Sequence, residues 1–280
     1  MIADYCIVGG GIAGTTAAEQ IRKLDSDARI VILEREPYTL YSRVLIPHYL
    51  KNRIPRQKVF LREISDYEKQ DISLYTGAEV TAHDPVRHEL SIHWGGGEDI
   101  CTYKKLLIAS GGAPKNVPVV FDNAGNTPIL RMQTLDDADH IKDMMERAPQ
   151  KEALVIGEGF IGMEFIETFV LNHFRTKVLC RGDVFLESRF GPTAGFIIED
   201  ALQKRGVEFF KRTNEDKLES TVFAERDGTK QYPALIGMGI GIDRALKPFM
   251  GVEKQSGILA DQHLVTNDPD IFVAGDVAEY

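Results

Sequence analysis

Residues 5–14 read YCIVGGGIAG, and this stretch decides the fold. Residues 6–8 are an apolar run typical of a buried strand, and three glycines follow it, at Gly9, Gly11 and Gly14. We expect a helix over residues 15–24 and a second strand over 30–33 that ends on Glu34. In this order the first glycine permits a tight turn, the second lets a pyrophosphate approach the backbone, and the third lets helix and strand pack closely. With the free N–H groups of the helix start and an acid suited to ribose hydroxyls, the stretch predicts a dinucleotide site. The alternative is a glycine-rich turn without a ligand.

The same order returns later in the chain. Residues 153–156 read as a strand, 163–173 as a helix and 177–180 as a strand, and a second glycine motif stands between them, at Gly157, Gly159 and Gly162. An internal repeat is stronger evidence than either copy alone. We therefore expect two dinucleotides, or one bound across the repeat. A duplication in which one copy has lost its ligand is the alternative.

The segments around these copies supply further elements. The hairpin turn Gly95-Gly96-Gly97 separates strands expected at 90–94 and 100–103. A separate apolar strand is expected at 106–109. Thr134 is a plausible N-cap for a helix that runs to about Arg147. The remaining expectations are a helix at 66–70, strands at 72–75, 79–82 and 207–210, a helix ending at Gly206, and a polar stretch at 214–225 without a clear assignment.

Length and charge bound the class of protein. A chain of 280 residues has room for two domains, and its net charge of −9 argues against a nucleic-acid surface. The short basic cluster Arg53–Lys58 reads as a solvated loop or as a docking patch for a small acidic redox protein. There is no basic, apolar leader and no run of membrane-spanning length, so a soluble, cytoplasmic protein is expected.

The cysteines and histidines suggest no metal site. Cys6, Cys101 and Cys180 are far apart in the sequence and read as buried thiols of a reducing compartment. His83, His88 and His93 recur at a spacing that fits neither a helix face nor a strand face, so we expect them on the surface.

Four motifs, in order, resemble the pyridine nucleotide-disulfide oxidoreductase superfamily of FAD- and NAD(P)H-dependent flavoproteins. They are GGGIAG with Glu34, LLIASGG at 106–112, GEGFIGME at 157–164 and TNDPDIFVAGDVAE at 266–279. The finer resemblance is to NADH:rubredoxin reductases and the flavin module of nitrite reductase, which share a stretch like Tyr41-Ser42-Arg43. The resemblance implies an α/β fold of two Rossmann-like domains, each with a parallel sheet and an antiparallel ribbon. One domain is inserted in the other: residues 1–114 and 242–280 would bind FAD, and 115–241 would bind NAD(P)H.

The resemblance also assigns residues to the two cofactors. In the FAD domain the glycine turn would take the pyrophosphate, Glu34 the ribose, Val80 the adenine, residues 109–111 the flavin, and Asp276 the ribityl chain, with a helix from Val277 aimed at the flavin. The alternative for Asp276 is a plain helix N-cap, which is compatible with the ribityl contact. The full set for FAD is Gly9, Gly11, Ile12, Ala13, Gly14, Glu34, Arg35, Arg43, Val80, Ala109, Ser110, Gly111, Gly275 and Asp276.

For NAD(P)H the implied set comes from the second copy: Gly157, Gly159, Phe160, Ile161, Gly162, Glu164, Arg181 and Gly239. Glu164 falls where the family has a carboxylate near the nicotinamide, although an acid in the first turn of a helix is the simpler interpretation.

Three departures from the family pattern narrow the function. Val44 stands where thiol-dependent members have a cysteine, so disulfide and peroxide chemistry through cysteine are disfavoured. Cys180 stands where NAD-selective members carry an acid, and Arg181 follows it, which favours NADPH over NADH, although Asp183 could serve NAD. The sequence ends at Tyr280, before the interface domain through which members of the family form dimers.

The expected function is therefore transfer of hydride from NAD(P)H to FAD and of electrons onward to an acceptor such as a small redox protein. Glu164, Arg43 and His48 are the candidate catalytic residues, with ordinary surface positions as the alternative for Arg43 and His48. Two other functions stay open at this point. One is a flavin-dependent binding or sensing protein of the apoptosis-inducing-factor type, and the other is the electron-feeding module of a larger reductase.

Overall fold

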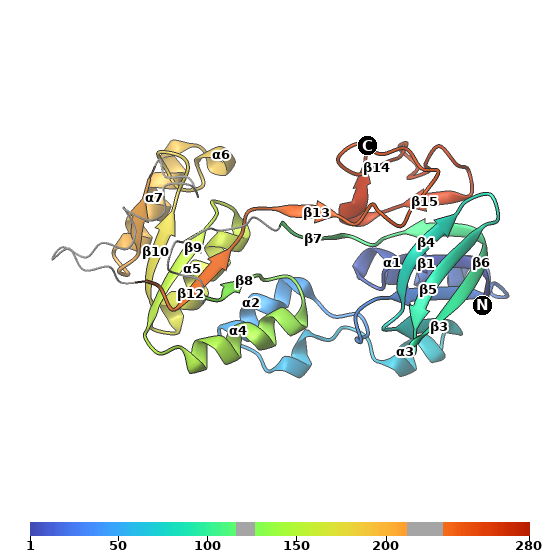
Figure 1. Ribbon diagram of the computed structural model, residues 1–280, viewed down its shortest axis with the longest axis horizontal. Helices are drawn as coiled ribbons and strands as arrows, with labels where there is room; N and C mark the ends of the chain where they lie inside the picture. The colour runs from blue at the N-terminus through green and yellow to red at the C-terminus, as the bar shows by residue number, and fades with distance from the viewer. Residues whose placement is uncertain (116–126, 212–231) are drawn as a thin grey trace. The chain divides into compact units, whose positions relative to one another are not determined.

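The computed structural model describes residues 1–115, 127–211 and 232–280 (Figure 1). Their contacts divide the chain into two units. The first comprises Met1–Ser42, Gln57–Ala113 and Asp243–Tyr280, and the second comprises Arg43–Arg56 and Pro114–Ile242. The polar stretch at 214–225 lies outside the described residues, so its assignment stays open.

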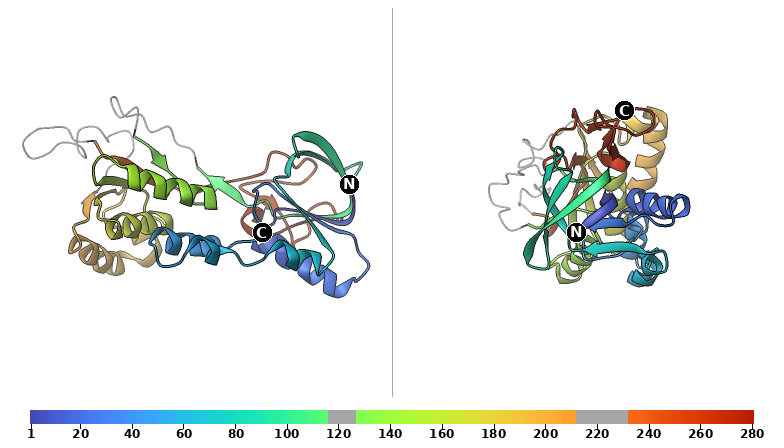
Figure 2. Two further views of the ribbon diagram at one scale, coloured as in Figure 1. Left: turned by 90° about the horizontal axis from the view of Figure 1, so that it is seen from below. Right: turned by 90° about the vertical axis from the view of Figure 1, so that its right-hand side faces the viewer.

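The first unit is built on a seven-stranded mixed sheet. Its order is β3-β2-β1-β6-β5-β4, and β15 pairs with β6. The pairs among β1, β2, β3, β6 and β15 are parallel, whereas β4, β5 and β6 form an antiparallel ribbon, drawn in teal and green in Figures 1 and 2. The bounds are β1 Ile2–Val8, α1 Ile12–Leu24, β2 Ile30–Glu34, η2 Arg56–Val59, α3 Ile64–Glu68, β3 Ile72–Thr76, β4 Glu79–Asp84, β5 Glu89–Trp94, β6 Gly97–Ile108, β14 Ile258–Leu259, β15 Ile271–Val273, η4 Gly275–Val277 and β16 Ala278–Glu279.

The apolar runs that predicted β1 and β2 are buried because a parallel sheet is covered on both faces. Ile7, Ile30 and Ile32 pack toward Ala18 of α1, and Cys6, Val8 and Leu33 pack on the other face. The predicted α/β class with a parallel sheet and an antiparallel ribbon is confirmed.

One strand replaces two of the predicted strands. Residues 100–103 and 106–109 were expected as separate strands, but β6 runs without interruption from Gly97 to Ile108. Its first half pairs with β5 and its second half with β1 and β15, so the strand leaves the ribbon and enters the parallel sheet. Lys104 and Lys105, which lie between the two predicted strands, pair with the carboxylates of Asp4 and Asp270.

The second unit holds a five-stranded parallel sheet in the order β11-β10-β9-β12-β8. Thr134 caps α4 as predicted: its hydroxyl accepts the Asp137 N–H at 3.0 Å, and the Asp137 carboxylate accepts the Thr134 N–H at 2.8 Å. The bounds are η1 Arg43–Leu45, α2 Ile46–Leu50, β8 Ile129–Leu130, α4 Leu135–Arg147, β9 Glu152–Ile156, α5 Phe160–Leu171, β10 Arg175–Leu179, α6 Glu187–Phe190, α7 Pro192–Gln203, β11 Glu208–Phe210 and β12 Leu235–Met238. The chain passes between the units through β7 Gly112–Pro114 and β13 Ile242–Arg244, which pair with each other.

The predicted domain boundaries place the segment 43–56 in the FAD-binding domain, whereas the contacts of the chain group it with the second unit. In the structure α2 packs against α4 and α5 of the second unit. The carboxylate of Asp139 accepts the Tyr49 hydroxyl and the Arg56 Nε, each at 2.8 Å, and Lys142 donates to Asn52. These polar contacts are between residues far apart in the sequence, so no local pattern announced them.

The three cysteines are buried as expected, but one histidine is not where the sequence put it. His83 is 4% exposed, and its ring nitrogens lie 2.7 Å from the Tyr103 hydroxyl and 3.0 Å from the Met250 carbonyl oxygen. Burial lowers the pKa of His83, and these two partners satisfy its ring inside the core. Among the described residues, no helix is long and apolar enough to cross a membrane, and no cluster of side chains could hold a metal ion.

Candidate functional site

The first glycine turn lies where β1 ends, at the point of the sheet where the strand order reverses from β2 to β6. A Cβ on Gly9 would overlap the carbonyl of Ala109 at the end of β6, and a Cβ on Gly14 would overlap the carbonyl oxygen of Gly9. A Cβ on Gly11, in contrast, would meet no atom within 4 Å. The outer glycines are thus needed for packing inside the protein, while the middle one faces open space in front of α1. This is the cradle that a pyrophosphate requires.

Glu34 reaches back to the turn from the end of β2. Its carboxylate accepts the Gly10 N–H at 2.5 Å and the Glu36 N–H at 2.8 Å. The Thr15 hydroxyl donates to the Gly10 carbonyl at 3.0 Å and lies 3.3 Å from the hydroxyl of buried Tyr67. The Gly10 and Glu36 N–H groups fix the Glu34 carboxylate beside the turn, and Thr15 braces the turn itself at Gly10. Neither Thr15 nor Tyr67 was singled out from the sequence.

The structure brings the other predicted FAD motifs to the same edge of the sheet. Ala109 follows β6, and its N–H donates to the Val8 carbonyl at 2.8 Å. Gly275, with φ of +78°, follows β15 and would place a Cβ 3.4 Å from Ala13 of α1. Asp276 is exposed beside it.

The rest of the predicted FAD set is spread more widely. Ser110 and Gly111 are half-buried after Ala109, Ile12 and Arg35 are exposed, and Val80 is half-buried on β4. Arg43 belongs to the second unit.

A helix beginning at Val277 was expected, and this prediction is wrong for the described chain. Residues 275–277 form a single 3-10 turn, and Ala278 and Glu279 then pair with Ile258 and Leu259 as strand β16. The Arg244 guanidinium donates to the Asp276 carbonyl at 2.6 Å and the Glu279 carboxylate accepts the Gly257 N–H at 2.6 Å, which holds the backbone extended. Sequence reasoning did not single out Arg244.

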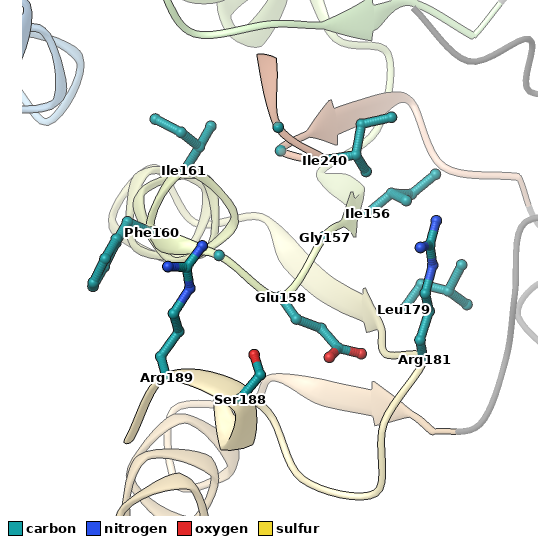
Figure 3. Close-up of a pocket in the computed structure, with 13 residues that line it drawn as sticks. Ile156, Gly157, Glu158, Phe160, Ile161, Leu179, Arg181, Ser188, Arg189 and Ile240 are labelled. Carbon is teal, nitrogen blue, oxygen red and sulfur yellow. The ribbon is translucent and has the colours of Figure 1, made fainter. Parts of the chain in front are cut away.

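The second glycine turn repeats the geometry of the first. A Cβ on Gly157 would overlap the carbonyl oxygen of Gly239, and one on Gly162 would overlap that of Gly157. A Cβ on Gly159 would have only that Gly239 oxygen nearby, at 3.9 Å. A cavity of about 520 Å³ opens in front of α5 (Figure 3). Its lining includes the predicted residues Gly157, Gly159, Phe160, Ile161, Arg181 and Gly239.

The lining of this cavity also includes an acid, Glu158, that was not singled out from the sequence. The register of the sheet pairs Leu179 with Ile156 as it pairs Leu33 with Val8, so Cys180 is the structural counterpart of Glu34. The Cys180 thiol is fully buried, and burial, with the nearby carboxylate of Glu158 adding to it, raises its pKa to about 12. Glu158, however, points its carboxylate from the turn toward the end of β10, between Arg181 and Arg189 (Figure 3). There its Oε1 accepts the Gly182 N–H at 2.9 Å.

Glu164 has a partner that the sequence did not reveal. The ammonium of Lys51, whose side chain is 3% exposed, donates to the carboxylates of both Glu164 and Glu167. Burial alone would raise the pKa of Glu167, but Lys51 and then Arg53 lower it below its usual value. A single lysine in the stretch HYLKNR gives no sign of this role.

The other two catalytic candidates are exposed. Arg43 donates to the Gln133 carbonyl at 2.6 Å, and His48 lies on α2. Arg53 and Arg56 of the basic cluster are each paired with a carboxylate of this unit, which leaves less positive charge for a docking patch.

Each unit by itself therefore fits a dinucleotide, because each offers a glycine cradle, a helix start without a side-chain cap and a carboxylate that a backbone N–H holds beside the turn. The first unit brings Ala109 and Gly275 to the same edge of the sheet as its glycine turn, and the second has a cavity in front of its own turn.

The chain is similar to known proteins in sequence and in fold. The chain is 28% identical over 284 residues to "Nitrite reductase [NAD(P)H]" of Bacillus subtilis, and the match covers 98% of the chain but only 34% of that protein. It is 31% identical to the 3-phenylpropionate/cinnamic acid dioxygenase ferredoxin–NAD(+) reductase component of Photorhabdus laumondii, over 98% of the chain and 69% of that protein. The solved covalent putidaredoxin reductase–putidaredoxin complex superposes with a TM-score of 0.84 at 25% identity, over 99% of the chain and 68% of that structure's chain. The sequence model of the pyridine nucleotide-disulphide oxidoreductase family matches residues 3–280 of the chain. The chain therefore belongs to the pyridine nucleotide-disulphide oxidoreductase family.

Proposed function

We propose that the chain is the FAD- and NAD(P)H-binding part of an oxidoreductase that delivers electrons to a small redox protein. The observation that carries the proposal is the pair of glycine cradles, one in each unit, each with its own ribose-end carboxylate. Family membership implies both cofactors, and when bound they supply hydride transfer from NAD(P)H to FAD and electron transfer onward. The absence of a cysteine at Val44 supports direct electron delivery without a thiol relay.

The chain's own residues bind and orient the cofactors. In the first unit the open face of Gly11 admits the pyrophosphate of FAD, and Glu34, held by Gly10 and Glu36, accepts from the adenosine ribose. In the second unit Gly159 and the start of α5 take the pyrophosphate of the nicotinamide nucleotide.

The proposed role of Glu164 is to bond the nicotinamide amide, with Lys51 holding its carboxylate in one position. Arg43 and His48 stay in the proposal as exposed groups on the segment 43–56.

The proposed acceptor is a small redox protein. Among the similar proteins, one is named a ferredoxin–NAD(+) reductase component, and a solved structure holds putidaredoxin reductase joined to putidaredoxin. The nitrite reductase match, which spans about a third of that enzyme, supports a second candidate, the electron-feeding module of a larger reductase. Nothing in the site favours the sensing protein of the apoptosis-inducing-factor type over these two.

The choice of nicotinamide nucleotide has evidence on both sides. The missing acid at Cys180 favours NADPH, and Arg181 and Arg189, which line the cavity, could pair with a 2′-phosphate. The carboxylate of Glu158 opposes such a phosphate.

Anaerobic mixing of the purified flavoprotein with NADH or NADPH tests the function. We expect either nucleotide to bleach the flavin absorption near 450 nm, roughly the value for flavins in general. The oxidised spectrum should return when a small redox protein such as a ferredoxin or rubredoxin is added. Failure of both nucleotides to reduce the flavin would refute the proposal.

A further inference from the structure

Each glycine turn has a carboxylate beside it that accepts a backbone N–H, but the carboxylate comes from opposite sides in the two units. In the first unit the turn residue Gly10 donates its N–H and the strand-end residue Glu34 supplies the carboxylate. In the second unit the turn residue Glu158 supplies the carboxylate, and Gly182, just beyond the end of β10, donates its N–H. Donor and acceptor have exchanged places across the same gap between turn and strand. The acid missing at Cys180 thus has a replacement from the opposite side.

We propose that Glu158 is the ribose-binding acid of the nicotinamide site and that it selects NADH over NADPH. This rests on the proposed function, since it requires the cavity of the second unit to be the nicotinamide nucleotide site. A preference for NADH is the opposite of the preference for NADPH that the sequence suggested. The Glu158 carboxylate has space at the end of β10 because the residue opposite it, Gly182, has no side chain. A Cβ on Gly182 would lie 3.5 Å from Glu158 Oε2.

From this position the Glu158 carboxylate can both bind the ribose hydroxyls of NADH and repel the 2′-phosphate of NADPH. Its Oε1 accepts the Gly182 N–H at 2.9 Å, and the half-buried group faces the cavity beside Arg181 (Figure 3). A carboxylate so placed accepts from the vicinal 2′- and 3′-hydroxyls of a ribose, as the strand-end acid does in other dinucleotide sites. A 2′-phosphate brings roughly 1.5 to 2 negative charges to the same place and meets like charge at short range.

Arg181 and Arg189 do not cancel this repulsion. Both are exposed, so solvent screens their charges, whereas Glu158 is half-buried and pinned by a backbone donor. Removing the charge of Glu158 while keeping its shape should therefore leave the two arginines as the dominant charges of the cavity. The site would then accept a 2′-phosphate.

The test measures binding directly, by isothermal titration calorimetry of the oxidised holoprotein with NAD⁺ and NADP⁺, and with the fragments 5′-AMP and 2′,5′-ADP. We expect the unaltered protein to bind the nucleotides with a free 2′-hydroxyl more tightly. In Glu158→Gln the ratio of dissociation constants should shift toward the 2′-phosphorylated partner by at least about tenfold, the size expected for one charge near a phosphate in a half-buried site. Glu158→Asp, which keeps the charge, should retain the original preference.

Glu187→Gln is the matched control, because Glu187 lies in the exposed first turn of α6 and outside the cavity lining. It makes the same change of charge and should leave the ratio unaltered. An equal ratio in Glu158→Gln and the unaltered protein, with tight binding of at least one nucleotide, would overturn this inference alone, as would a preference of the unaltered protein for 2′,5′-ADP. Absence of binding by both NAD⁺ and NADP⁺ would overturn the proposed function as well.

Discussion

Gly11→Ala separates the fold of the first unit from its cofactor. A Cβ at this position meets nothing within 4 Å in the protein, and the backbone angles, φ −67° and ψ −172°, are ordinary for alanine. The free energy of unfolding of the cofactor-free protein should therefore change by no more than about 1 kcal/mol, the sum of a small gain from a stiffer unfolded chain and a small loss at the helix N-cap. The added methyl group occupies the space through which a pyrophosphate reaches the backbone. Loss of one hydrogen bond to a charged phosphate costs about 1.5–3 kcal/mol, which is roughly a 10-fold to 150-fold rise in the dissociation constant for FAD.

Gly14→Ala is the matched control, since its Cβ would overlap the Gly9 carbonyl oxygen and lie 3.0 Å from the Ile7 side chain. Overpacking of this kind costs about 1–3 kcal/mol, so this variant should lose stability as well as affinity. The assay is titration of the cofactor-free proteins with FAD, followed by flavin fluorescence, beside thermal unfolding of the same samples. If Gly11→Ala binds FAD as tightly as the unaltered protein, the pyrophosphate does not approach the backbone at Gly11, and the assignment of this turn is wrong.

Three further predictions concern the second unit. Lys51→Met should cost about 1–2 kcal/mol at pH 7 in chemical denaturation, because it leaves the half-exposed carboxylates of Glu164 and Glu167 without their shared cation. The pKa of Glu167 is lowered in the folded state, so this stabilisation is present above its unfolded pKa and should vanish as the pH falls through the lowered value; a difference that persists in acid would contradict the ion pair. Thr134→Ala should lower stability by about 1 kcal/mol through loss of the α4 cap, with Thr134→Ser as a control that keeps the hydroxyl. Cys180, with a pKa of about 12 and no exposure, should resist alkylation by iodoacetamide at pH 8 until the protein is unfolded, and rapid labelling of the native protein would show that the end of β10 opens.

The parts of the fold that the sequence predicted best depend on local chemistry. Gly9 and Gly14 cannot carry a side chain in this packing, and the cap of α4 at Thr134 uses residues three positions apart. The hairpin at Gly95 and Gly96 likewise follows from two consecutive residues with positive φ. In each case the physical constraint acts over a few residues, so the pattern of residue types was sufficient to reveal it.

The errors arose where a distant partner decides the outcome. His83 is polar in isolation, yet Tyr103 and the Met250 carbonyl make it a core residue. The basic cluster Arg53–Lys58 suggested a solvated loop or a docking patch, but Arg53 and Arg56 pair with carboxylates of α5 and α4. Residues 278–279 were expected to continue a helix and instead complete a ladder with β14. No spacing within the sequence encodes these pairings.

In the second glycine motif, one feature could be predicted from the sequence and a neighbouring one could not. Comparison of the two copies located the missing acid at Cys180, and the register of the sheet supports that position. Its replacement was not found, because Glu158 stands 24 residues before Gly182, within a motif whose intervening position tolerates many residue types. An acid absent from the strand end is therefore insufficient evidence for NADPH. The residue between the first two glycines must also be inspected, since it reaches the same corner of the site from the other side, and in this chain it carries the opposite charge from the one that a 2′-phosphate needs.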